Sequence, residues 1–289
     1  MWIKKLVTTV ALAVGLSASV ASAADTVRFA VTDIEGLENL QREFGAFRDK
    51  LEGFTGYEIK FFPVNSRTAA VEAMKSDQVD FVLTGPAEYV VFKARTDAKV
   101  VVGWQRPNYF AQIVTMADGP IKKTTDLAGK KVSFGSVGST SQHLGPAQAL
   151  ADVGLKYGND YDPQIISRNV AVEALIRGDL AAVGMNFGHL EKIRQKFPDQ
   201  AFTVVARGRD LPNDILIASP NVSDEMFNKM RAAFIDHGNE LMSAVLTGDD
   251  NQKYKGGFFL NSVKDQDYDY VRAMYETIGV NSFNQFVGD

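Results

Sequence analysis

The sequence has no cysteine, and it has only three histidines among its 289 residues. Without a thiol there is no disulfide scaffold, thiolate zinc site, iron–sulfur cluster or cysteine nucleophile. The histidines, His143, His189 and His237, stand far apart in the chain and form no metal-binding pattern. We therefore expect neither a metal site nor a cofactor.

Basic runs are missing as well. The formal net charge is −4 and the isoelectric point is near 5.5, whereas nucleic-acid binders carry a basic patch or stripe. Nucleic acid is therefore excluded as a partner. The composition, with 45% hydrophobic and 23% charged residues, is that of an ordinary folded protein long enough for two domains.

Catalytic signatures are absent too. The chain has no G-x-S-x-G elbow, no G-x-x-x-x-G-K-[ST] phosphate loop and no H-E-x-x-H pair. Ser141 and His143 are not a catalytic pair, because a serine hydrolase brings its histidine from a distant segment. We expect a protein that binds a ligand without catalysing a reaction.

Residues 1–23 have the features of a secretory signal peptide. Lys4 and Lys5 precede the uncharged apolar stretch Leu6–Leu16, and Ala21-Ser22-Ala23 supplies the small residues of a cleavage site. The stretch is shorter than the roughly 20 apolar residues of a membrane span. An uncleaved anchor is the alternative. Cleavage predicts a mature chain from near Ala24 in the periplasm, without a lipid anchor because no cysteine is available.

Strand-like and helix-like patterns alternate along the mature chain, which predicts βαβ units in an α/β fold with mainly parallel sheets. The first series has strands at 27–31, 59–64 and 81–84, with helices at 37–51 and 68–75. The second has strands at 131–134, 181–185 and 202–206, with helices at 144–153, 171–177 and 189–196. A strand at 214–218 returns to the first unit. A long helix from Ser223 to Gly248 and a last helix at 268–275 follow.

The chain is expected to cross between two lobes near 116–120 and again near 210–216. Two short crossings favour a hinged clamshell over two independent domains. We assign 24–117 and 216–289 to lobe 1, and 118–215 to lobe 2.

The most informative segment is Gly135–Pro146, between a predicted strand and a predicted helix. Ser139, Thr140 and Ser141 stand where the helix begins, and a helix N-terminus already favours an anion. Hydroxyl groups add neutral donors there. The alternative is an ordinary N-cap, since Ser and Thr are common capping residues.

These features together resemble the periplasmic substrate-binding proteins of phosphate, phosphite and phosphonate ABC transporters, the PhnD-like group, from Val27 to about Gly279. The similarity rests on four segments in the family's order: Val71–Phe81, Gly85-Pro86-Ala87-Glu88-Tyr89, Ser139-Thr140-Ser141 and Leu211-Pro212-Asn213-Asp214. The resemblance implies a two-lobed clamshell of the type II periplasmic-binding-protein fold. It also implies a small oxyanion ligand and an ABC permease as partner.

The resemblance further implies roles for individual residues. Ser139, Thr140 and Ser141 would donate hydrogen bonds to the oxyanion, and Tyr109 and Tyr89 match family tyrosines. Asp214 matches an acid that meets the amine in aminophosphonate binders.

The chain also departs from the family pattern. Arg67 stands where a tyrosine is usual, Arg168 near a usual histidine, Gln142 at a usual glycine and Gly188 at the second acid of aminophosphonate binders. Two arginines would favour a compact oxyanion over an ammonium-bearing ligand, unless they face solvent or pair with acids. Asp214 argues the other way.

The sequence thus predicts the solute-binding component of an ABC importer. A sensory role, in which the same clamshell reports to a membrane histidine kinase, is the alternative. A hydrolase of phosphate or phosphonate esters is disfavoured, since metal ligands are lacking.

Overall fold

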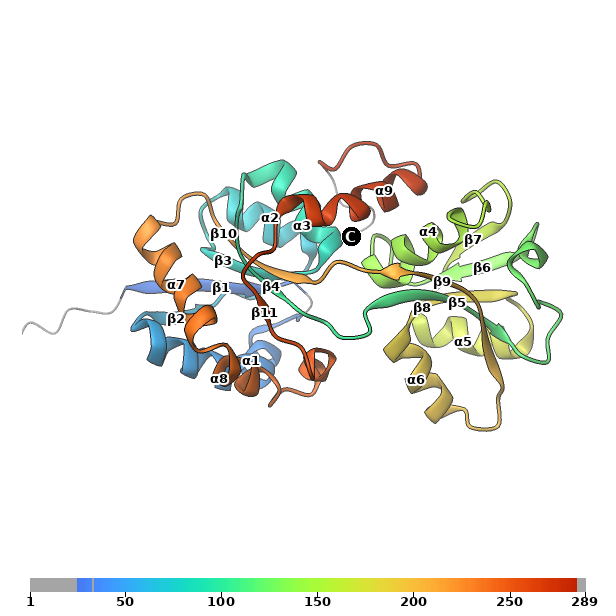
Figure 1. Ribbon diagram of the computed structural model, residues 1–289, viewed down its shortest axis with the longest axis horizontal. Coiled ribbons are helices and arrows are strands. Elements are labelled where there is room, and N and C mark those ends of the chain that lie inside the picture. Colours follow the sequence, from blue (N-terminus) through green and yellow to red (C-terminus); the bar gives the residue numbers. More distant parts are fainter. Residues whose placement is uncertain (1–24, 33, 285–289) are drawn as a thin grey trace, which may run out of the picture.

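The computed structural model describes residues 25–32 and 34–284. The expected signal peptide lies outside these residues. The described chain forms two β-sheets, one of six strands and one of five, each with helices on both faces. Figure 1 shows the first sheet and its helices at the left and the second at the right. The two-lobed α/β fold expected from the sequence is confirmed.

Lobe 1 is built on the sheet with strand order β11-β4-β10-β3-β1-β2. Its strands are β1 (Thr26–Val31), β2 (Glu58–Phe61), β3 (Phe81–Thr84), β4 (Lys99–Trp104), β10 (Asp214–Ala218) and β11 (Phe259–Leu260). Its helices are α1 (Leu37–Thr55), α2 (Arg67–Lys75), α3 (Pro86–Thr96), α7 (Asp224–Asp236), α8 (Gly238–Val245) and α9 (Asp269–Thr277).

Alternation along β1 divides the core of lobe 1 between the two faces of its sheet. Val27 and Phe29 belong to the cluster beneath α1, α7 and α8, whereas Ala30 belongs to the cluster with α2, α3 and α9. The expected stripe on α1 is buried in the first cluster, with Phe44 and Phe47 packed edge to face. Burial of such aromatic side chains contributes most of the energy that holds a lobe together.

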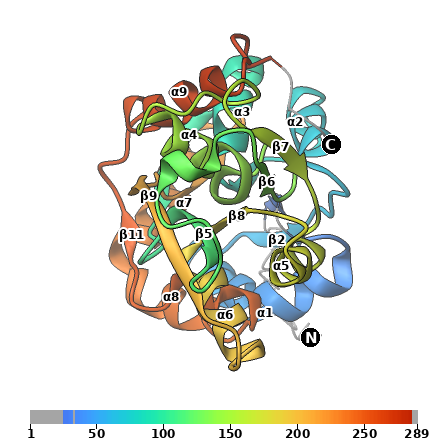
Figure 2. The same cartoon turned by 90° about the vertical axis from the view of Figure 1, so that its right-hand side faces the viewer.

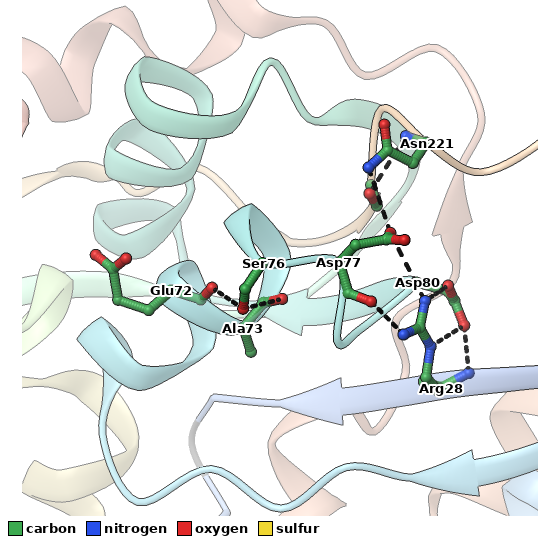
Figure 3. Close-up of polar contacts among 8 residues, drawn as sticks. Arg28, Glu72, Ala73, Ser76, Asp77, Asp80 and Asn221 are labelled. Atoms are coloured by element: carbon green, nitrogen blue, oxygen red, sulfur yellow. Dashed lines mark hydrogen bonds and ion pairs between the residues drawn. The ribbon is translucent and has the colours of Figure 1, made fainter.

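A polar network ties the turn after α2 to β1 (Figure 3). The Arg28 Nε donates to Asp80 at 2.9 Å, and the Arg28 guanidinium also donates to the carbonyl of Asp77. Asp77 has a positive φ of 57°, and its carboxylate accepts from Asn221 at 3.3 Å. Hydrogen bonding to Asp80 raises the pKa of Arg28. The network fixes the tight turn that leads into β3.

Lobe 2 is built on the sheet with strand order β7-β6-β8-β5-β9. Its strands are β5 (Phe110–Met116), β6 (Lys131–Phe134), β7 (Asp162–Ile165), β8 (Ala182–Asn186) and β9 (Phe202–Asp210). Its helices are α4 (Gly145–Ala151), α5 (Arg168–Arg177) and α6 (Phe187–Lys196). Figure 2 looks onto this lobe, with α4 on one face of the sheet and α5 and α6 on the other.

Both sheets are mixed, with four of the six strands of lobe 1 and four of the five strands of lobe 2 running in the same direction. In lobe 1, β2, β1 and β3 are parallel, and β10, β4 and β11 add antiparallel pairs. In lobe 2, β7, β6 and β8 are parallel, while β5 pairs antiparallel with β8 and β9. The reversed strands are β10 and β11 in lobe 1 and β5 in lobe 2, and of these β5 and β10 adjoin the two crossings between lobes.

The first crossing lies at 105–109, earlier than the 116–120 expected. The boundary differs because β5 belongs to the sheet of lobe 2, although the sequence pattern placed it in lobe 1. The second crossing lies at 211–213, within the range expected. The long helix predicted after Ser223 is two helices, α7 and α8, which meet at His237.

Helix α9 bridges the lobes at a third place (Figure 1). The Tyr275 phenol donates to the carbonyl of Ala87 in lobe 1 at 3.1 Å. The Thr277 hydroxyl donates to Gln148 on α4 of lobe 2 at 2.5 Å. The last helix is therefore not a part of lobe 1 alone.

Candidate functional site

A cleft of about 760 Å³ lies between the lobes. Its wall includes groups from lobe 1, from the first crossing and from lobe 2, namely Arg67, Glu88, Arg106, Tyr109, Ser139, Thr140, Ser141, Gln142, Arg168, Asn186 and His189. Six of the eight site residues expected from the sequence line this cleft: Arg67, Tyr109, Ser139, Thr140, Ser141 and Arg168.

The turn that carries the three hydroxyls follows β6 and runs through a π-helical turn, Thr140–Leu144, into α4. It is held from behind by His143, whose Nδ1 accepts from the Gly138 N–H at 3.0 Å and whose Nε2 contacts the Tyr157 hydroxyl at 2.9 Å. Gly138 has a φ of 73°, which favours glycine at this position. Burial lowers the pKa of His143 to about 4, so its ring is neutral at pH 7.

The hydroxyls do not cap the turn. Ser139 stands at the N-cap position and makes no side-chain capping bond. The Thr140 Oγ1 accepts from the Ala87 N–H of lobe 1 at 3.0 Å, and the Ser141 Oγ accepts from Asn186 Nδ2 at 3.1 Å. Because each of these two oxygens accepts a bond from protein, its own hydrogen is left to donate. The side-chain geometry therefore gives no support to the simple N-cap alternative.

Tyr109 extends this series of donors. Tyr109 lines the same cleft, and burial raises the pKa of Tyr109 to about 12. The phenol therefore keeps its proton at neutral pH and can donate it to an acceptor in the cleft.

Arg168 is the cation of lobe 2. It stands at the first position of α5 and its Nε donates to Gln142 Oε1 at 3.1 Å. Gln142 is itself packed over Gly135, where a Cβ would meet its Oε1 at 2.5 Å. Burial, and then the charge of Arg106, lower the pKa of Arg168. Two guanidinium groups thus influence each other in this cleft.

Arg106 comes from the first crossing, and sequence reasoning missed it. Its guanidinium lies over the Tyr109 ring at 3.8 Å from the centroid and donates to Asp214 at 3.3 Å. Asp214 is 2% exposed and also accepts from the Tyr254 hydroxyl at 2.7 Å. The Asp214 carboxylate is therefore bound to protein and does not line the cleft. The Asp214 carboxylate holds the Arg106 guanidinium in place on the side away from the cleft.

Arg67 lines the cleft but is paired within lobe 1. Its Nε forms an ion pair with Glu88, which is 3% exposed and stands in the first turn of α3. A buried pair of this kind is neutral as a unit, so Arg67 contributes less to an anion than a cation without an acid beside it. Pairing of Arg67 with an acid is the alternative that the sequence analysis left open.

Tyr89 lies outside the cleft. Its side chain is fully buried against Tyr268, with ring centroids 4.4 Å apart, and its hydroxyl donates to Asp265 at 2.8 Å. Burial raises the pKa of Tyr89. The structure places this residue in the core between α3 and α9, so it does not join the expected site residues.

The described residues contain no cluster of three or more His, Asp or Glu side chains that would hold a metal ion. Within the same part of the chain, no helix has the length and apolarity needed to span a membrane. The groups that line the cleft include hydroxyls, guanidiniums, amides, an imidazole, lysine ammoniums and the carboxylates of Glu88, Glu191, Asp249 and Asp250.

The family model of the periplasmic substrate-binding protein of phosphonate ABC transporters matches residues 29–256. The chain belongs to this family. Its members are periplasmic binding components of transporters, and the family resemblance stated from the sequence is confirmed.

One curated relative is the phosphate-import protein PhnD of Mycolicibacterium smegmatis. It is 30% identical to this chain over 146 residues, which cover 48% of this chain and 46% of that protein. The match thus spans less than half of the relative's length.

Solved structures share the fold. The binding protein component of a phosphonate ABC transporter from Pseudomonas aeruginosa has a TM-score of 0.64 and 19% identity, over 87% of this chain and 85% of that one. PhnD1 of Prochlorococcus marinus, solved with methylphosphonate, has a TM-score of 0.62 and 17% identity, over 88% and 98%.

Proposed function

We propose that this protein captures a small oxyanion of the phosphate, phosphite or phosphonate class and delivers it to an ABC permease. The proposal includes export to the periplasm as a soluble chain that starts near Ala24. It is supported by family membership and by the ligands named for relatives, phosphate in one case and methylphosphonate in the other. The protein acts by binding and release, and we assign it no catalytic step.

The observation that carries the proposal is the state of Arg168. Among the residues that the structure describes, Arg168 has no acidic partner, and its Nε donates to the neutral amide of Gln142. It faces the same cleft as Arg106 and the hydroxyls of Ser139 to Ser141. An unneutralised guanidinium beside several neutral donors is complementary to an oxyanion.

Donors come from the crossing and from both lobes, which links binding to closure. Arg67 belongs to lobe 1, Arg106 and Tyr109 to the crossing, and Arg168 and the hydroxyls to lobe 2. A ligand that contacts all of them only when the lobes approach stabilises the closed form and shifts the population toward it. A permease that recognises the closed form would then receive loaded protein.

The structure also supports a preference for ligands without an ammonium group. Asp214, the acid that would receive an amine, is bound to Arg106 and Tyr254. The Arg168 guanidinium, which bonds a neutral amide, faces the cleft and repels a second cation. We therefore expect phosphate, phosphite or methylphosphonate to bind more tightly than 2-aminoethylphosphonate.

Calorimetric titration and thermal melting with phosphate, phosphite, methylphosphonate, sulfate and 2-aminoethylphosphonate test the proposal. A bound ligand at 100 times its dissociation constant adds about 2.7 kcal/mol to the free energy of unfolding. The Arg168→Ala variant should lose roughly 1.5–3 kcal/mol of binding energy, or about 10- to 150-fold in affinity.

Arg177→Ala is the matched control, because Arg177 stands in the last turn of the same helix and pairs with Asp179 at 3.0 Å. It should leave the affinity unchanged. If none of the anions raises the melting temperature, or if the two variants bind equally well, the proposed function is wrong.

A further inference from the structure

His189 lines the same cleft as the hydroxyls and is left out of every contact so far assigned to a ligand. It stands in the first turn of α6, and its side chain is 5% exposed. The Asn186 side chain caps this turn by accepting from the His189 N–H at 2.8 Å. The same Asn186 donates to Ser141, so His189 lies one side chain away from the hydroxyl turn.

The imidazole has an unused hydrogen-bonding group. Its Nδ1 is buried, and no group in the described chain forms a hydrogen bond with it. A buried polar atom without a partner destabilises the protein unless something else satisfies it. Sites that keep such a group commonly use it in function. Rotation about Cβ–Cγ exchanges the two edges of the ring, so either nitrogen is available to a group in the cleft.

The charges around the ring determine what it can bind. Arg168 and Lys192 both line the cleft near it. Burial, followed by the charges of Arg168 and Lys192, lowers the pKa of His189 to about 3. The ring is neutral at pH 7 and offers one N–H. It therefore adds a donor without adding a charge, in a place where two cations already attract an anion.

We propose that His189 is a ligand contact that donates an imidazole N–H to an oxygen of the bound oxyanion. This inference rests on the proposed function and adds a specific recognition element to it. The N–H of the neutral ring would donate to an oxygen of phosphate or of a phosphonate. The charged side chains that line the cleft beside it on α6 are Glu191 and Lys192, and Arg168 on α5 adds a second cation.

The experiment compares three variants with the wild-type protein, with inorganic phosphate and methylphosphonate as the probes. His189→Ala should weaken binding of the tighter probe by roughly tenfold, the effect of one lost hydrogen bond to a charged group. His189→Gln keeps a neutral N–H donor and should stay within about threefold of wild type. His237→Ala is the control, because His237 stacks on Phe54 at 3.9 Å in lobe 1, away from the cleft wall.

A spectroscopic measurement on the unaltered protein does not depend on how the variants fold. With only three histidines in the sequence, the ring ¹⁵N resonances can be assigned by single substitution. Saturation with the probe should move the His189 ring signals, produce a slowly exchanging imidazole N–H and leave His237 unmoved.

The outcomes separate the two proposals. If wild type binds neither probe nor any other oxyanion tested, the proposed function fails and this inference falls with it. If wild type binds and His189→Ala binds equally well, or if the His189 signals stay fixed at saturation, the inference alone is wrong. Equal weakening in the Ala and Gln variants would also overturn it, because the Gln side chain retains the donor.

Discussion

Thr140 has a single hydroxyl group that serves both lobes. Its oxygen accepts from the Ala87 N–H of lobe 1, which leaves its hydrogen for a ligand on the side of the cleft. Loss of the Thr140 hydroxyl should therefore have a larger effect than loss of a capping residue, because it affects the contact between lobes as well as the site. Ser139, by comparison, makes no capping bond and lines the cleft.

Replacing Thr140 by Ala should therefore affect binding more than folding. We expect a loss of about 1.5–3 kcal/mol in oxyanion affinity, against about 1 kcal/mol in the free energy of unfolding. Thr140→Ser retains the hydroxyl and serves as the control, with affinity near that of wild type. Calorimetry and thermal melting on the same samples separate the two effects. A lowered melting temperature with unchanged affinity would contradict the assignment.

The two buried histidines give the protein a pH-dependent stability. Burial lowers the pKa of His143 to about 4 and that of His189 to about 3, from an ordinary value of 6.5. Below pH 6.5 the unfolded chain binds protons that the folded chain does not. Stability is therefore complete above that pH and declines as the pH falls toward 4, by at most about 1.4 kcal/mol per pH unit for each histidine.

Urea unfolding at pH 7.5, 6.0 and 5.0 tests this expectation. In His189→Gln the slope of the unfolding free energy against pH should be smaller, by the amount that corresponds to the uptake of about one proton on unfolding. An unchanged slope in the variant would show that the His189 ring takes up its proton in the folded state.

At the level of elements, alternation and helical stripes predicted most of the fold because those signals are local. They indicated β1, α1, β6 and most other elements within a few residues. Strands β4 and β5 were missed, since both are buried on both faces and their apolar runs show no alternation. Because these two strands flank the first crossing and neither shows alternation, the position of that crossing was also predicted wrongly. A continuous buried strand has no sequence period that distinguishes it from other apolar segments.

The site was predictable to the extent that its residues share one local segment. Ser139, Thr140 and Ser141 were found because three hydroxyls stand together at a strand-to-helix junction. Arg106 was missed, because its partner Asp214 is 108 positions away and its place beside the cleft follows from a crossing that the sequence pattern did not locate. An arginine two residues after an apolar run was the available signal. The pairing of Arg67 with Glu88 depends equally on tertiary structure.

At the level of the whole molecule, the two crossings are tied to each other. Arg106 from the first crossing binds Asp214, where the second crossing enters β10, and its backbone N–H donates to Asn213 at 3.0 Å. The Tyr254 hydroxyl joins the same carboxylate. Asp214 thus belongs to the hinge, and its role in this chain is to hold the two crossing segments together.

Asp214→Asn distinguishes a hinge role from an amine-binding role. Breaking a buried ion pair should lower the free energy of unfolding by about 3 kcal/mol. The ratio of affinities for methylphosphonate and 2-aminoethylphosphonate should stay within about threefold of wild type, because the carboxylate does not face the ligand. Urea unfolding and paired titrations measure both quantities. A large selective loss of the aminophosphonate would restore Asp214 as an amine acceptor.

Trp104 ends β4 at the point where the chain leaves lobe 1, and it stands opposite Asp214 in the register of β10. Its indole is fully buried and packs edge-on against Tyr254, at 5.5 Å between centroids. The only other tryptophan of the chain, Trp2, belongs to the segment expected to be removed on export. Once that segment is removed, Trp104 would be the single tryptophan of the protein, placed at the hinge. The fluorescence emission of this tryptophan would report movement of the lobes about the hinge without an added label.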